Sequence, residues 1–132
     1  MSVESMWGDI NDMAAVRPPH ELIEEQGQFL AKMSKGVLEL KMERKHSSTV
    51  FNYDIYIAVP SMNHRQRIFR LTHDFKLYPA NLYDEQGTNE YRSKDQEEFE
   101  INLGKILSSK ETMATINTLM AQVRMGSSDT MV

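Results

Sequence analysis

The chain contains no cysteine among its 132 residues. This absence excludes disulfide bridges, iron–sulfur clusters, thiolate zinc sites and cysteine nucleophiles. The glycines are scattered, so the chain also lacks a glycine-rich loop of the kind that binds phosphate groups. Its histidines form neither an H-x-x-x-H nor an H-E-x-x-H pair, so the helical zinc pattern is missing. The sequence therefore predicts no metal site and no cofactor.

Long apolar runs are absent as well. No stretch approaches the roughly 18 apolar residues that a membrane span needs, and the first residues lack the basic and apolar regions of a secretion signal. We therefore expect a cytoplasmic protein with no membrane partner. The formal net charge of −4 argues against a general affinity for nucleic acid, because phosphate binding favours basic surfaces.

The remaining composition is that of one folded domain. Apolar residues make up 40 % of the chain and charged residues 26 %, and a chain of this length can bury roughly two-thirds of its unfolded surface. We expect a single α+β domain over residues 18–125. Residues 1–17 would form an N-terminal segment, for which mobility is the default at a chain end, and residues 126–132 a flexible tail.

Helical periodicity predicts three helices. A Pro18-Pro19 pair precedes a helix expected over residues 19–34, and Gly36 follows its end. Two capping patterns, Ser93-Lys94-Asp95-Gln96 and Ser108-Ser109-Lys110-Glu111, predict the starts of two further helices near the end of the chain. Each helix has an apolar face that must pack on another element.

Between these helices, alternation of apolar and polar residues predicts an antiparallel β-meander of about four strands. The expected strands lie at residues 38–43, 50–59 and 67–73, with a fourth within residues 75–84. The fold class is therefore α+β, with an N-terminal helix, the meander, and two C-terminal helices. All helices would pack on one sheet face, because an apolar sheet face needs a partner.

The stretch from Val50 to Pro60, VFNYDIYIAVP, is the expected central strand, and its alternation separates two faces. If Ser47-Ser48 forms a two-residue hairpin turn, Leu40 lies opposite Ile55. The core face then collects apolar side chains: Leu38, Leu40, Met42, Phe51, Tyr53, Ile55, Ile57, Phe69 and Leu71. The other face collects polar ones: Glu39, Lys41, Glu43, Asn52, Asp54, Arg70 and Thr72. One-sided burial of this kind is typical of antiparallel sheets.

One end of the polar face is the candidate partner-binding site. Turning the third strand back about residues 62–64 places Tyr56 opposite Arg70 and Ala58 opposite Ile68. These side chains would present apolar area beside an arginine on a face without helices, and Tyr and Arg are enriched at interface hot spots. We therefore expect a protein partner, or a second copy in a homodimer, to bind through Tyr56, Ala58, Ile68 and Arg70.

These features together predict a non-enzymatic interaction protein. The chain is small, acidic and free of cysteine, a profile shared by adaptors, chaperone-like proteins and immunity-like proteins. The resemblance is one of composition and not of motif. Two alternatives stay open beside it.

The first alternative is a small-ligand binding protein or an enzyme. Its pocket would lie between the sheet and the helices, with Tyr53, His73 and Asp74 at the mouth, because a His–Asp pair can perform acid–base chemistry. The serine and cysteine motifs that would complete a nucleophilic site are missing. The identity of a small molecule is not indicated by any residue pattern.

The second alternative is an accessory protein for nucleic acid that uses Arg65, Arg67 and Arg70. Alternation places Arg65 and Arg67 on the same face as Phe69 and Arg70 on the opposite face, with Arg65 expected in the turn and Arg67 at the margin of the core. The other basic cluster, Arg44-Lys45-His46, would lie at the opposite end of the sheet. Two separated clusters do not form a continuous track for phosphates, so the sequence disfavours this alternative.

Overall fold

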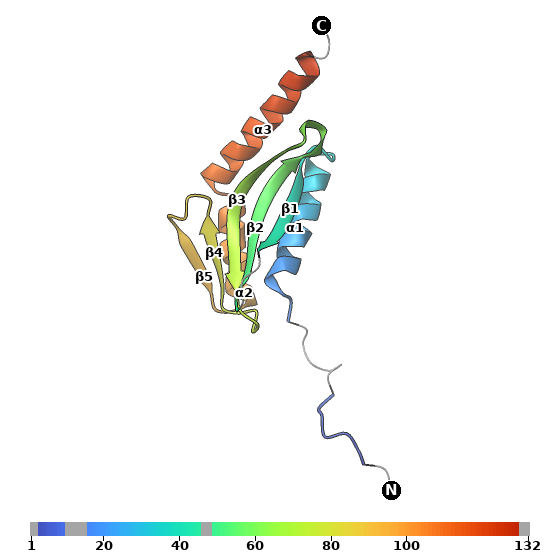
Figure 1. Ribbon diagram of the computed structural model, residues 1–132, viewed down its shortest axis with the longest axis vertical. Helices are drawn as coiled ribbons and strands as arrows, with labels where there is room; N and C mark the ends of the chain where they lie inside the picture. The colour runs from blue at the N-terminus through green and yellow to red at the C-terminus, as the bar shows by residue number, and fades with distance from the viewer. Residues whose placement is uncertain (1–2, 10–15, 46–48, 130–132) are drawn as a thin grey trace.

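The computed structural model describes residues 3–9, 16–45 and 49–129. In these segments the helices and strands follow in the order α1 (Pro19–Met33), β1 (Glu39–Lys45), β2 (Phe51–Val59), the 3-10 turn η1 (Pro60–Met62), β3 (His64–His73), β4 (Ala80–Asp84), β5 (Glu90–Ser93), α2 (Gln96–Leu107) and α3 (Lys110–Asp129). The strands form one five-stranded antiparallel sheet in the order β1-β2-β3-β4-β5 (Figure 1). The expected α+β fold is confirmed.

One strand more is present than the sequence indicated. The additional strand is β5, whose four residues are too few to show a clear period of two. Its last residue, Ser93, had been assigned to a helix cap instead. No helix of the described residues is both long and apolar enough to cross a bilayer.

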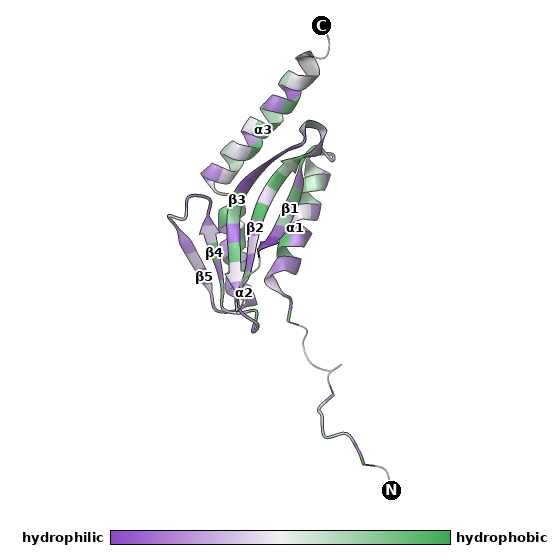
Figure 2. Ribbon diagram, viewed as in Figure 1, coloured by the Kyte–Doolittle hydropathy of each residue, from purple (hydrophilic) through white to green (hydrophobic). Residues whose placement is uncertain are grey.

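All three helices cover the same sheet face (Figure 1). α1 packs on β1, α2 on β4 and β5, and α3 on α2 and β3. Apolar and polar residues alternate along β2 and β3 (Figure 2), and the apolar ones enter the core. The buried apolar residues are Leu22, Ile23, Leu38, Ile55, Ile57, Val59, Ile68, Phe69, Leu71, Ala80, Leu82, Phe99, Leu103, Ile106 and Leu119.

Local sequence explains how the helices begin and how α1 reaches the sheet. A Cβ on Gly27 would lie 3.0 Å from Cβ of Leu40, so the glycine allows α1 to approach β1 closely. The cap of α2 is Asp95, whose carboxylate accepts a hydrogen bond from the Glu98 N–H at 2.9 Å. The Ser109 hydroxyl accepts from the Thr112 N–H at the start of α3. Both caps lie downstream of the serines expected to begin these helices.

The C-terminal helix is longer than the sequence indicated. Gly126 was expected to end it, but α3 continues to Asp129. Residues 10–15 and 130–132, which belong to the expected terminal segments, lie outside the described residues. The same is true of Ser47-Ser48, on which the expected first hairpin depends.

The strand registers differ from those expected. Leu40 lies opposite Ile57, and not opposite Ile55. A shift of two residues returns every side chain to the same face, so the division into two faces survives this error. The second hairpin differs more, because a β-bulge between β2 and β3 shifts the pairing at Ile55 and Tyr56.

An outer sheet face as a candidate interaction surface

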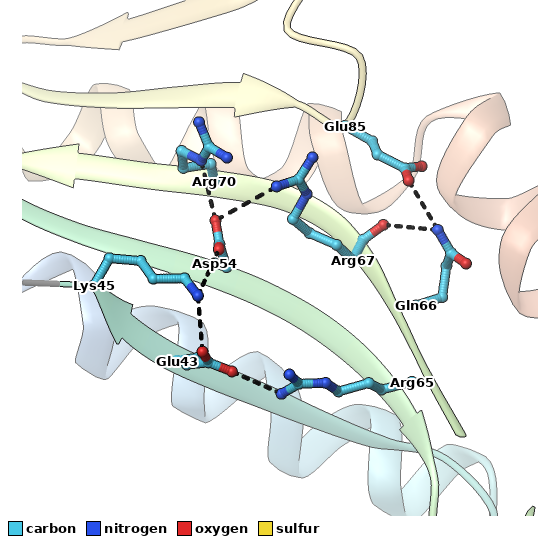
Figure 3. A network of polar contacts seen from close by, with 8 residues as sticks. All are labelled: Glu43, Lys45, Asp54, Arg65, Gln66, Arg67, Arg70 and Glu85. Carbon is cyan, nitrogen blue, oxygen red and sulfur yellow. Dashed lines mark hydrogen bonds and ion pairs between the residues drawn. The ribbon is translucent and has the colours of Figure 1, made fainter. Parts of the chain in front are cut away.

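The face of the sheet that points away from the helices is called the outer face here. It is formed by side chains of all five strands: Glu39, Lys41, Glu43, Lys45, Asn52, Asp54, Tyr56, Ala58, Arg65, Arg67, Arg70, Thr72, Asn81, Tyr83, Glu90 and Arg92. Figure 3 shows six of them, Glu43, Lys45, Asp54, Arg65, Arg67 and Arg70, on this side of the strands, with the helices behind the strands. No helix of the described chain covers the outer face.

The bulge decides which residues reach this face. Ile55 pairs with Phe69 and Tyr56 pairs with Arg67, so Ile68 is the additional residue of β3. In such a bulge, neighbouring residues can point to the same side. Ile68 accordingly joins Phe69 in the core, with 6 % of its surface exposed. The expectation that Ile68 lies on the outer face opposite Ala58 is therefore wrong.

The same bulge brings the arginines of β3 together. Arg67 pairs with Tyr56, Arg70 pairs with Asp54, and Arg65 pairs with Ala58, so all three arginines lie on the outer face. Arg65 therefore lies in β3 and not in the expected turn, and Arg67 lies on the outer face and not at the margin of the core, because regular alternation does not continue through the bulge. Lys45 reaches the same face from β1, so one residue of the other basic cluster lies beside these arginines, whereas Arg44 stacks on Phe51 instead.

A buried carboxylate lies at the centre of the outer face. Asp54 is only 4 % exposed, because the long side chains of its cationic neighbours lie over it. Arg70 Nε donates a hydrogen bond to Asp54 Oδ1 at 3.0 Å, and Arg67 Nη1 lies 3.9 Å from the same oxygen. Lys45 Nζ lies 3.7 Å from Oδ2 (Figure 3). Several cations thus share one carboxylate, which leaves this centre with excess positive charge.

A second ion-pair group positions Tyr56. Glu43 accepts hydrogen bonds from Lys45 and from Arg65, each at 2.8 Å. The Arg65 guanidinium carbon in turn lies 4.1 Å from the centroid of the Tyr56 ring, a cation–π contact. The hydrogen bond from Lys45, followed by the one from Arg65, lowers the pKa of Glu43. Glu43 likewise raises the pKa of Lys45. Both groups are therefore held in their charged forms.

The surface is hollowed on both sides of Arg70. One open cavity of about 450 Å³ is lined by Lys45, Asn52, Asp54, Arg70, Thr72 and Tyr83. A second, of about 220 Å³, is lined by Arg67, Arg70, Tyr83, Asp84, Glu85, Gln86 and Gly87. The Arg70 side chain is about half exposed between these hollows. A group that enters either hollow meets a guanidinium.

Three of the four residues expected to bind a partner lie on this surface. Tyr56 and Ala58 are half-buried and Arg70 is exposed, whereas Ile68 belongs to the core. Sequence reasoning missed the central role of Asp54. A signal was present, because an aspartate inside an otherwise apolar strand requires a counter-charge on its neighbours.

The residues of the expected ligand pocket form a packed stack instead. The Tyr53 and His73 rings lie 6.0 Å apart, and His73 also stacks on Phe51 at 5.2 Å. His73 Nδ1 donates a hydrogen bond to the Asp74 carbonyl oxygen at 2.8 Å. The Asp74 carboxylate accepts one from the Lys76 N–H, so the side chains of His73 and Asp74 do not form a catalytic pair in this arrangement. The cavities described above are lined by other residues.

Within the described residues, no three His, Asp or Glu side chains gather into a possible metal site. A comparison with protein-family models, with curated proteins and with solved structures found no match to this chain. Function must therefore be argued from the chemistry of the surface itself.

Proposed function

We propose that this protein is a non-enzymatic interaction domain whose outer face binds an acidic segment of a protein partner. The observation that carries the proposal is the convergence of Lys45, Arg67 and Arg70 on the single carboxylate of Asp54. The resulting excess of positive charge lies on an uncovered face of a protein whose net charge is −4. Charge complementarity of this kind selects partners and accelerates their association.

The geometry supports carboxylates as the recognised groups. Asp54 contacts Arg70 through Nε, and a guanidinium has further N–H donors in a planar fork that matches a carboxylate. The contact with Asp54 also fixes the orientation of Arg70, which reduces the entropy lost on binding. Beside it, Tyr56 offers an aromatic surface that Arg65 already orients. The same proposal places the protein in the cytoplasm.

The test uses a fluorescent peptide of glutamate and small apolar residues as the probe. We expect the wild-type protein to bind it, and an Arg67→Ala/Arg70→Ala variant to bind it at least about 10-fold more weakly, because hot-spot arginines contribute more than about 1.4 kcal/mol each. A Lys94→Ala/Lys105→Ala variant removes the same charge from exposed sites on the helical side and should bind like the wild type. Equal loss in both variants would contradict a localised site.

A second candidate function is favoured by one observation. The bulge gathers Arg65, Arg67 and Arg70 on one face with Lys45, an arrangement that could also bind phosphates of a nucleic acid. Against this, Asp54 and Glu43 neutralise part of the charge. A single-stranded oligonucleotide that displaces the peptide, with affinity that falls steeply as salt rises, would favour the nucleic-acid function. Binding of neither probe would refute both.

A further inference from the structure

The C-terminal helix has an unusual composition for a helix at a surface. From Thr112 to Ser128, α3 carries Arg124 as its single charged residue, in a chain where 26 % of residues are charged. Surface helices normally place charged side chains on the face that meets water. Depletion of charge is instead typical of the centre of a protein interface.

The packing of α3 within the chain accounts for only part of this composition, on the side where Ile116, Met120 and Val123 pack against the core. Between Lys110 and Gly126, Thr112 and Leu119 are the buried residues of the helix. Figure 1 shows α3 extending past the end of the sheet. Uncharged residues therefore face water on it, including Met113 and Met125, which are 45 % and 65 % exposed.

An apolar groove lies beside this helix, between α1 and α3, and is called the α1–α3 groove. Its volume is about 450 Å³, and Ile57 and Ile68 of the sheet form part of its lining. Phe29 and Met33 line it from α1 and are 53 % and 77 % exposed, and Met113 lines it from α3. Methionine adapts readily to the shape of a partner surface. The groove thus extends from exposed side chains of α1 and α3 down to buried core residues of the sheet.

We infer that a second copy of this chain fills the groove, in a homodimer in which α3 of each protomer packs against the α1–α3 groove of the other. The groove and the protruding helix, with its exposed methionines, lie next to each other on one surface, as a two-fold interface requires. Between Thr112 and Ser128 the helix carries one charge, so two copies packed along this part of α3 would bring few like charges together.

The size of the surface suits such a dimer. α3 has 20 residues and is about 30 Å long, and each helix is about 10 Å wide. With α1 at 15 residues, or about 22 Å, the two helices give a footprint of roughly 500 Å² before the groove between them is counted. Standard interfaces bury roughly 600–1,000 Å² per partner, so the surface suits a small dimer interface.

The N-terminal segment of the same chain is the competing occupant, because Met6 and Trp7 are 93 % and 86 % exposed. This segment joins α1 at its first residue, whereas Phe29 and Met33 lie near the last. The described arrangement therefore leaves the groove open to a second copy.

Sedimentation velocity across a wide concentration range tests the inference in the absence of any partner. We expect the wild type to sediment as a dimer of the 15.3 kDa chain. Met113→Asp, and independently Met33→Asp, should weaken the dimer by about 30-fold or more, because each buries a charge without a counter-charge. Ile101→Asp makes the same exchange at a 54 % exposed site on α2 outside the groove and should leave the dimer intact.

Several results would overturn the inference. A wild type that is monomeric at every concentration would do so. A dimer that neither Met33→Asp nor Met113→Asp weakens would do so too, provided that the circular dichroism spectrum of each variant is unchanged. A monomer in which Met33→Asp shifts the emission of Trp7 to longer wavelength would assign the groove to the N-terminal segment instead. These outcomes do not depend on whether the outer face binds an acidic peptide.

Discussion

Asp54 and Ile55 are neighbours in β2 and are exposed by 4 % and 0 %, yet they point to opposite faces of the sheet. Helices bury Ile55 on the inner face, where its apolar surface is removed from water. Arginine and lysine side chains bury Asp54 on the outer face, where charge is balanced by charge. Similar burial is thus reached by two different physical means.

The two faces differ in what holds them together. Apolar packing on the inner face gains free energy from burial and is specified by shape. The cations of the outer face are about half exposed, so their pairs with exposed carboxylates add little stability, whereas the buried charge of Asp54 is costly to remove because several cations share it. Under the proposed function, the excess positive charge around Asp54 serves recognition. If the helical side forms the inferred dimer, two outer faces remain uncovered and the assembly is bivalent.

The largest expected effect is a loss of stability when a buried residue of the inner face is truncated, compared with an exposed one. Phe69 is fully buried beside the bulge, and Phe69→Ala should lower the free energy of unfolding by about 3–5 kcal/mol, because it leaves a cavity. Phe75, which is 87 % exposed, is the matched control, and Phe75→Ala should cost less than about 1 kcal/mol. Urea denaturation followed by circular dichroism measures both values. Equal costs would contradict the described core.

A smaller effect is expected at the centre of the outer face. Asp54→Asn keeps the shape but removes the charge that Arg70 and Lys45 share, and it should lower the free energy of unfolding by about 2 kcal/mol. The same change should strengthen binding of the acidic peptide, because the positive excess rises. Glu24→Gln, at an exposed site on α1, should change neither quantity appreciably. A simultaneous loss of stability and of peptide binding would show that Asp54 acts by orienting Arg70.

The inner face could be predicted from the sequence because its signal is redundant. Each strand repeats the alternation, and a register error of two residues, as between Leu40 and Ile57, leaves every side chain on its face. A glycine inside a helix lowers its stability, yet Gly27 permits the close contact with Leu40. That role depends on a neighbour distant in sequence, which periodicity within the helix does not reveal.

The outer face could be predicted only in part, because one bulge reorganises it. The adjacent apolar residues Ile68 and Phe69 interrupt the alternation of β3, and this interruption was the available signal. If alternation is assumed to continue through this interruption, Ile68 is assigned to the wrong face, and Arg67 and Arg70 are placed on opposite faces. A pocket between the sheet and the helices was expected, but the α1–α3 groove has a different lining from the one expected, because its position depends on how α1 and α3 are placed over the sheet.

The smallest expected effect concerns the ionisation of two tyrosines, Tyr78 on the inner side of the sheet and Tyr83 on the outer face. Burial raises the pKa of Tyr78 to about 12, because its ring packs on Phe99 while its hydroxyl donates a hydrogen bond to the Arg17 carbonyl oxygen at 2.8 Å. The folded state thus favours neutral Tyr78, and its contribution to stability is complete below about pH 10 and lost as the pH rises through about 12.

Tyr78→Phe should therefore cost about 1 kcal/mol at neutral pH, the value of one hydrogen bond, and this cost should shrink at alkaline pH as the wild type loses its advantage. Urea denaturation at a series of pH values measures the change, and spectrophotometric titration should show one fewer late-ionising tyrosine in the variant. Tyr83→Phe is the control, since the Tyr83 hydroxyl contacts the exposed Glu90 carboxylate on the outer face. If the tyrosine that ionises at the highest pH is still seen in Tyr78→Phe but is lost in Tyr83→Phe, then Tyr83 and not Tyr78 is the buried tyrosine, and the prediction is contradicted.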